Sequence, residues 1–323
     1  MQSWWALIIA AVLSSTALLT APSHTPVELN TPAEPTTPFE SIERATSPQA
    51  AEAPGNCASL FEPAFVAELE RRFEPIVFTA AVHDTQSGCR YELNPEEDLT
   101  TASAIKLHVL GATLARYQDL GEELSATDRE RAERMIHYSH NTPPTSALYD
   151  AVGLAGMRAY GEAVGAPDIA HTPTYGITRA SAVELNAVAL ATLHDGSPGP
   201  LTVASRAVAR DIVSGVHHSQ QWGISAAAPV GWTALAKNGF FPCASSNCAP
   251  FAGIRTWRVA STGVLFGPST EAVGVTILTD GATTQAQGIA ALEAIAKHIG
   301  EQMFGEVAAV SYTHLTLPTN REV

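Results

Sequence analysis

The chain has 323 residues, of which 46% are hydrophobic and 15% are charged, and its formal net charge is −14. This length and composition indicate a folded protein with a sizeable core, in one large domain or two modest ones. The negative charge and the lack of any Lys/Arg cluster exclude an electrostatic nucleic-acid interface. Only Lys106, Lys237 and Lys297 are lysines among the 18 cationic residues, so each lysine is a candidate for a specific role.

The N-terminal segment predicts export. Residues 4–21 form an unbroken run of apolar and small residues, which is typical of a secretory signal peptide, and Ser15 and Ala17 offer a cleavage pattern. The run has no preceding Lys or Arg and approaches the length that spans a bilayer, so a membrane anchor over residues 1–21 is the alternative. Either interpretation places the rest of the chain outside the cytoplasm, secreted or associated with the cell envelope.

Residues 22–56, rich in Pro, Thr, Glu and Ala, predict a linker between this segment and the folded domain. At the other end, residues 311–323 differ in composition from everything before them. They resemble translated vector sequence, so we expect a non-native tail that contributes nothing to the fold.

Apolar periodicity divides the expected domain, residues 57–306, into helices and strands. The expected ranges are, in chain order, 59–73 (helix), 76–84 and 89–93 (hairpin), 102–191 (helical block with a loop at 171–178), 202–214 (helix), 233–237, 256–266 and 271–279 (strands), and 285–303 (closing helix). The hairpin and the late strands must meet in one antiparallel sheet. The predicted fold is therefore mixed α/β (α+β), with a sheet part over 57–100 and 230–306 and a helical part over 101–229.

The four cysteines fit an oxidising compartment. Cys243 and Cys248 are close in sequence and look like a staple on a surface loop, which leaves Cys57 to pair with Cys89. Three pairings are possible in principle. A zinc site is the rival interpretation, but no His lies at ligand spacing from either pair, and we expect no metal.

Three short motifs occur in order: Ser103-Ala-Ile-Lys106, Ser139-His140-Asn141 and Lys237-Asn238-Gly239. Each has an ordinary structural interpretation when taken alone. Ser103 would lie near a helix N-cap, the second motif would be a helix-ending turn, and Asn-Gly would be a hairpin turn.

Together the motifs resemble the Ser-x-x-Lys, Ser-Asp-Asn and Lys-Thr-Gly of class A β-lactamases and penicillin-binding proteins. The resemblance covers residues 60–303 and includes two of the three lysines. Within this superfamily the chain resembles most the exported actinobacterial serine hydrolases that share Lys-Asn-Gly followed by an aromatic residue. The resemblance implies an antiparallel sheet flanked by N- and C-terminal helices, an inserted all-helical domain, an active site between the two parts, and no cofactor.

The resemblance also implies the catalytic roles. Ser103 would be the nucleophile, and Lys106, one turn away on a helix, would take its proton. Lys106 can do so near neutral pH only if burial or a nearby positive charge, such as that of Lys237, lowers its pKa. Ser139 would carry the proton to the leaving nitrogen. The backbone N–H groups of Ser103 and Phe240 would form the oxyanion hole.

The expected substrate contacts are Asn141, Asn238, Gly239, Phe240 and Arg258, with Arg255 as the alternative to the last. Asn141 would hold a substrate amide, and the arginine would bind a substrate carboxylate. Two departures from the family pattern bear on these roles. His140 stands where the family has Asp, and Asn238 replaces a hydroxyl that contacts the substrate carboxylate, which puts carboxylate recognition in doubt.

The glutamate that activates the deacylating water in class A enzymes is missing. It should lie in the loop over residues 166–178, whose sole acid is Asp168. Residues 182–186 look like the family's Glu-x-Glu-Leu-Asn with the first Glu changed to Ala. Their downstream context fits the next helix instead, which predicts Glu184 on a solvated face and Leu185 in the core.

Three functions are consistent with these residues. The leading one is an exported serine hydrolase, β-lactamase-like, that forms an acyl-enzyme with β-lactams or related amides and esters and deacylates slowly. The second is a DD-peptidase or esterase of the penicillin-binding type, acting on a peptidoglycan-type amide. The third is a retired enzyme that binds cell-wall peptide without cleaving it. Retention of the four catalytic residues favours an enzyme, and we expect a monomer.

Overall fold

The computed structural model describes residues 57–244 and 255–305, all of which belong to one compact unit. The predicted signal peptide or anchor, the linker, the tail over 311–323 and Cys248 lie outside the described residues. Within the described ranges, no helix combines the length and the apolar character that crossing a membrane requires.

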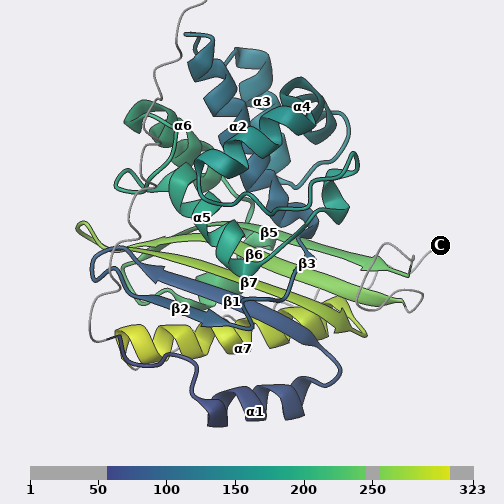
Figure 1. Ribbon diagram of the computed structural model, residues 1–323, viewed down its shortest axis with the longest axis vertical. Helices are drawn as coiled ribbons and strands as arrows, with labels where there is room; N and C mark the ends of the chain where they lie inside the picture. The colour runs from purple at the N-terminus through teal and green to yellow at the C-terminus, as the bar shows by residue number, and fades with distance from the viewer. Residues whose placement is uncertain (1–56, 245–254, 306–323) are drawn as a thin grey trace, which may run out of the picture. The chain divides into compact units, whose positions relative to one another are not determined.

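A five-stranded antiparallel sheet forms the middle layer (Figure 1). Its strands are, in spatial order, β2 (Arg90–Leu93), β1 (Val77–Asp84), β7 (Ala272–Ala282), β6 (Thr256–Phe266) and β5 (Thr233–Cys243). The register of β1 on β7 runs from Val77 opposite Asp280 to Asp84 opposite Val273. The early hairpin and the late strands therefore share one sheet, which confirms the predicted mixed α/β fold.

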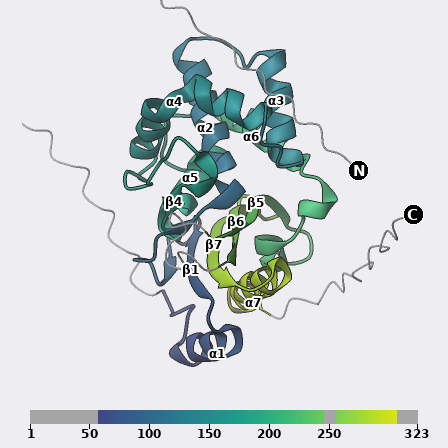
Figure 2. The ribbon, with the colours of Figure 1, turned by 90° about the vertical axis from the view of Figure 1, so that its right-hand side faces the viewer.

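Helices cover both faces of this sheet (Figures 1 and 2). On one face α7 (Gln285–Phe304) lies on β6 and β7, and α1 (Pro63–Phe73) packs against α7. On the other face α5 (Ala182–Leu193) contacts β1, β6 and β7. α2 (Lys106–Asp119) and α6 (Val203–Ser214) pack against α5, and α3 (Ala126–His137) and α4 (Pro144–Ala163) pack against α2 and against each other. Each face thus has its own apolar core.

The helices on both faces of the sheet explain why β7 has no alternation of buried and exposed residues. Every residue of the strand is buried, because helices cover both of its sides, so it lacks the alternation of a half-exposed strand. β5, at the sheet edge, keeps an exposed residue at Phe240. An edge strand also leaves part of its backbone hydrogen-bonding groups unused by the sheet.

Two element boundaries differ from the sequence prediction by four residues or more. The first helix begins at Pro63 rather than at residue 59, because proline occupies its first turn, where it has no hydrogen bond to lose. β5 continues to Cys243 instead of ending at Lys237, and Asn238 and Gly239 pair with Ser261 and Ala260 inside the ladder. The hairpin-turn interpretation of Asn-Gly is therefore wrong.

The structure confirms the disulfide between Cys57 and Cys89. It ties the start of the described chain to the beginning of β2, across a sequence separation of 32 residues. No cysteine in the described ranges is free. The second predicted pair, Cys243 with Cys248, includes a residue outside the described residues and stays a prediction.

Replacing both Cys57 and Cys89 with Ala should lower the free energy of unfolding by about 3–4 kcal/mol. A loop of this length loses roughly that much chain entropy in the unfolded state when it is closed. Urea unfolding followed by circular dichroism would measure the difference. An unchanged midpoint and slope would contradict the stabilising role, and non-reducing peptide mapping of the parent protein should recover the linked pair.

Candidate active site

The three motifs meet where the helical part rests on the edge of the sheet. Ser103 lies in a short 3₁₀ helix, η1 (Ala102–Ile105), that leads directly into α2, and Ser139 follows the end of α3. Both places use left-handed backbone: φ is 48° at Ala102 and 58° at Ser139. Such conformations cost of order 1–3 kcal/mol in non-glycine residues and persist where the surrounding structure enforces them.

Lys106 is fully buried and its amine is directed at the Ser139 turn. Its Nζ lies 2.6 Å from the Ser139 carbonyl oxygen, 2.8 Å from Asn141 Oδ1 and 3.2 Å from Ser139 Oγ. The two shorter bonds need two N–H groups, which is the number that a neutral amine keeps. Its lone pair is then left for a proton donor.

Lys237 reaches the same hydroxyl from the sheet. It is fully buried on β5, and its Nζ donates to the Asn238 carbonyl at 2.7 Å and lies 3.2 Å from Ser139 Oγ. The Ser139 hydroxyl thus lies between two amines. A hydroxyl both donates and accepts, so it can pass a proton between them.

Burial lowers the pKa of Lys106 to about 7. Burial, and after it the charge of Lys106, also lowers the pKa of Lys237 well below its usual value. The sequence left two causes open for Lys106, and burial is the one that acts. Near neutral pH the pair therefore provides an amine able to accept a proton.

Gly239 holds the sheet edge against the nucleophile. A Cβ at this position would lie 2.4 Å from the Ser103 backbone nitrogen and 2.6 Å from that of Ala104. No side chain other than hydrogen fits such an approach. The contact places the backbone of Gly239, which precedes Phe240, against the backbone of Ser103.

Asn141 is exposed and Asn238 is buried, so the two asparagines have different surroundings. Asn141 uses its oxygen on Lys106, and its Nδ2 remains available to a substrate amide. The Asn238 amide donates to the carbonyls of Gln220 at 2.6 Å and Trp222 at 2.9 Å. A structural contact therefore replaces the predicted substrate contact of Asn238.

Arg258 is fully buried, and its Nε lies 3.0 Å from Asp280 Oδ2. Its Nη1 donates to the carbonyls of Cys243 and Thr256. The predicted role of Arg258 in binding a substrate carboxylate is wrong, because the guanidinium is used inside the protein. The alternative, Arg255, is exposed. Ala260 on β6 lies opposite Gly239, and Arg255 comes five residues before Ala260, which is a distance of roughly 17 Å along an extended chain.

The loop over residues 166–178 packs against the segment that holds Ser103. Its short 3₁₀ helix η2 (Tyr175–Ile177) contacts η1, and the Thr101 N–H donates to the Thr178 carbonyl. Asp168 itself is exposed. Glu184 is buried and forms a capping box with Ser181 at the start of α5, so its predicted position on a solvated face is wrong. Leu185 lies in the core, as predicted.

One residue of this loop was missed by the sequence interpretation. The ring of Tyr175 lies with its centroid 5.9 Å from Lys106 Nζ. Burial raises the pKa of Tyr175, although a hydrogen bond from Thr145 opposes the shift. The phenol is therefore neutral near pH 7. In the sequence, the only sign of Tyr175 was an aromatic residue in the loop where a carboxylate for deacylation was expected.

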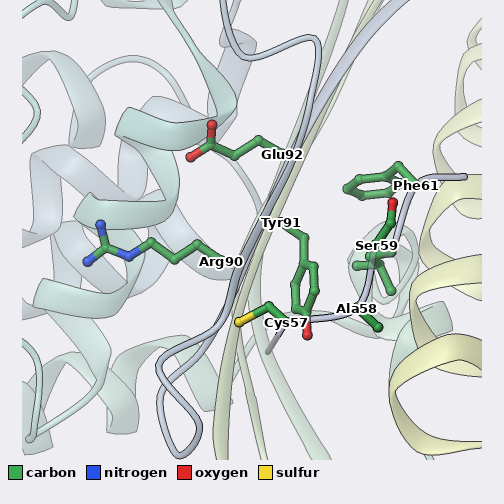
Figure 3. Close-up of a pocket in the computed structure, with 8 residues that line it drawn as sticks. Cys57, Ala58, Ser59, Phe61, Arg90, Tyr91 and Glu92 are labelled. Carbon is green, nitrogen blue, oxygen red and sulfur yellow. The ribbon is translucent and has the colours of Figure 1, made fainter. Parts of the chain in front are cut away.

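The described residues contain no group of three His, Cys, Asp or Glu side chains able to hold a metal ion. A separate pocket of about 230 Å³ lies between residues 57–61 and β2 (Figure 3). None of its lining residues belongs to the three motifs.

Solved structures with this fold are class A β-lactamases and a penicillin-binding protein. The protein PenP of Rhodopseudomonas palustris, assigned to class A β-lactamases, matches with a TM-score of 0.59 and 21% identity over 74% of this chain and 98% of its own. The ancestral class A β-lactamase GNCA matches with a TM-score of 0.56 and 19% identity over 73% of this chain and 98% of its own. PBP-A matches with a TM-score of 0.58 and 16% identity over 73% of this chain and 94% of its own. No family model and no curated protein matches the chain.

These likenesses define the class of fold: the chain has the architecture of the β-lactamase and penicillin-binding serine hydrolases. The fold that the resemblance implied is thus confirmed by an independent comparison of backbones. At this level of identity the fold alone is carried over, and the chemistry rests on the side chains described above.

The pKa of Lys106 predicts how the reaction of Ser103 depends on pH. If the neutral amine is the base, the rate of acylation should rise with pH and reach half its maximum near pH 7, because burial holds the pKa of Lys106 at about 7. Stopped-flow release of p-nitrophenol from an activated ester would measure it. A profile that is flat between pH 5.5 and 8.5 would contradict the assignment.

Gly239→Ala should reduce acylation by at least 100-fold, because the new methyl group would push β5 away from the Ser103 and Ala104 backbone. Gly231→Ala is the matched control: its φ is 87°, but nothing lies within 4 Å of its Cβ position. The control should lose some stability while it retains acylation. Equal rates for both variants would contradict the close-contact role of Gly239.

Proposed function

We propose that the protein is an active-site-serine hydrolase or acyltransferase that forms an acyl-enzyme at Ser103. The observation that carries the proposal is the buried amine of Lys106, with a pKa of about 7 and hydrogen bonds to Ser139 and Asn141. A structural lysine buried to this extent would be paired with a carboxylate. None lies within ion-pair distance of Lys106 among the described residues.

Acylation follows from these groups. The Ser103 hydroxyl passes its proton to neutral Lys106, and its oxygen attacks the substrate carbonyl carbon. The N–H groups of Ser103 and Phe240 stabilise the charge that develops on the carbonyl oxygen. As the bond to the leaving group breaks, the Ser139 hydroxyl donates its proton to the leaving atom and regains one from protonated Lys106.

Deacylation needs a base that activates water near the ester, and the described site offers a poor one. The loop that should carry it presents Tyr175, a neutral phenol, to Lys106, while its one acid, Asp168, is exposed. Lack of a general base typically slows a step by about two to four orders of magnitude. We therefore propose that the acyl-enzyme persists.

The substrate class is an amide or ester with a reactive carbonyl, including β-lactams. A mutant of PBP-A forms an acyl-enzyme complex with penicillin G on the same fold, at a TM-score of 0.57 and 17% identity to this chain. A DD-peptidase or esterase of the penicillin-binding type uses the same groups and remains the alternative. We further propose that the protein is exported and acts as a monomer.

A labelled penicillin should leave a mass adduct on the peptide that contains Ser103, and the adduct should persist for minutes or longer. Ser103→Ala should abolish it. Lys106→Ala should slow its formation by about two to four orders of magnitude, because the proton acceptor is removed. Intact-mass spectrometry over time, followed by peptide mapping, measures both formation and loss.

Lys297→Ala is the matched control, since this lysine is exposed on α7 and belongs to none of the three motifs. It should form the adduct at the parent rate. Rapid hydrolysis without a trapped species would contradict slow deacylation. Failure to react with any penicillin, cephalosporin or activated ester would favour a binding module that no longer catalyses.

A further inference from the structure

The aromatic ring of Tyr175 lies beside the amine of Lys106. Lys106 Nζ is placed over the ring, 5.9 Å from its centroid, which is within the distance of about 6 Å at which a cation and an aromatic face attract each other. The hydrogen bonds of the same amine go to oxygen atoms of Ser139 and Asn141. The surroundings of the amine therefore combine oxygen acceptors with an aromatic face.

Side chains of α4 hold this ring in place. Tyr175 packs on Tyr149, with 5.5 Å between the ring centroids, and its hydroxyl is hydrogen-bonded to Thr145. Thr145 is fully buried, and its own hydroxyl donates to the carbonyl of His140, next to Ser139. One threonine thus links the ring to the turn that carries the second motif.

The loop that carries the ring is tied down on both sides of it. Before the ring, the Tyr149 hydroxyl donates to the Thr172 carbonyl at 2.6 Å. After the ring, the backbone N–H and the hydroxyl of Thr101 donate to the Thr178 carbonyl at 2.9 and 3.0 Å. Thr101 lies two residues before the candidate nucleophile, so the loop and the nucleophile segment are held together.

Acylation would create a charge on Lys106 that no carboxylate balances. When the buried amine takes a proton from Ser103 it becomes an ammonium, and none of the ion pairs among the described residues includes Lys106. A buried cation without a counter-charge is strongly unfavourable. The negative face of an aromatic ring offsets part of this cost.

The titratable groups near Lys106 come from several elements, and none of them supplies a negative charge near neutral pH. Lys237 reaches from β5 and, when charged, disfavours a second positive charge. Tyr149 is neutral because burial raises its pKa. His108, on the same helix, is also neutral because burial lowers its pKa to about 3. His140, in the second motif, is exposed to solvent.

We propose that Tyr175 is a positioning residue of the acylation step, whose ring stabilises the ammonium that Lys106 becomes when it takes the proton of Ser103. The serine oxygen forms its bond to the substrate carbonyl carbon as the proton leaves, and no bond to Tyr175 is made or broken. The ring acts on the charge, while the hydroxyl anchors the ring through Thr145. This inference rests on the function proposed above.

A change in the charge distribution of the ring at nearly constant shape tests the proposal. Tyr175→Phe keeps the aromatic face and removes the hydroxyl. Tyr175→pentafluorophenylalanine has a ring of similar shape, but its fluorine atoms reverse the charge distribution of the face. Burial of Lys106 is the same in both variants, so their difference reports the attraction itself. The pKa of Lys106 should be lower in the fluorinated variant by about half a unit or more.

The small number of lysines makes this pKa measurable without a substrate. Lys106, Lys237 and Lys297 are the lysines of the chain, so labelling lysine with ¹³C at Cε gives one NMR signal for each. Lys106→Arg and Lys297→Arg assign the signals, and a pH titration follows them. In parallel, acylation by an activated ester should reach half its maximum at a lower pH in the fluorinated variant, and its plateau should fall severalfold because the base is weaker.

The matched control makes the same two replacements at Tyr91, which is half-buried on β2 and belongs to none of the three motifs. Tyr91→Phe and Tyr91→pentafluorophenylalanine should give the same pKa for Lys106 and the same acylation profile. A difference as large as that of the Tyr175 pair would refute the proposal, since the effect of fluorine would then be general.

The remaining outcomes separate this inference from the proposed function. An equal or higher pKa of Lys106 in the fluorinated Tyr175 variant would overturn the inference, whether or not the protein acylates. A lower pKa with an unchanged acylation profile would overturn the role of the ring in acylation and leave the serine mechanism intact. If the parent protein forms no adduct on Ser103, both the proposed function and this inference fall.

Discussion

The site depends on burying two lysine amines around a single hydroxyl. An ammonium strongly prefers water, so a fold that removes both Lys106 and Lys237 from solvent must lower the pKa of each. Ser139 and Asn141 supply the oxygen atoms that make this burial tolerable. The same arrangement requires a left-handed backbone at Ser139 and a residue without a side chain at Gly239.

Much of the fold could be predicted from the sequence because each element carries a local signal. Periodicity located α6 and α7 within one residue, and the hairpin of β1 and β2 followed from an alternating pattern and a turn. The extent of β5 could not be read in the same way. Asn-Gly has a strong turn preference, and only the pairing with β6, a tertiary constraint, overrides it.

The candidate site was predictable to a similar degree, and the predictions that failed did so for a related reason. The order of the motifs pointed to Ser103, Lys106, Ser139 and Lys237. In the structure both lysine amines lie 3.2 Å from Ser139 Oγ. Gly239, two residues after Lys237, is in close contact with the Ser103 backbone. The substrate contacts expected of Asn238 and Arg258 depended on which partner each side chain finds, and those partners lie 15–22 residues away along the chain. Spacing in a sequence does not specify such competition between internal and external partners.

The pairing of β1 with β7 has a consequence for when the three motifs can first come together. Val77 and Asp280 are neighbours in the sheet although about two hundred residues separate them, and Ser103 and Lys237 come from opposite halves of the chain. Contacts of such long range slow folding, because the chain must close a large loop before it gains them. A nascent chain that lacks its last strands therefore has Ser103 without Lys237 or Gly239 beside it. The three motifs come together only when those strands have been made and have joined the sheet.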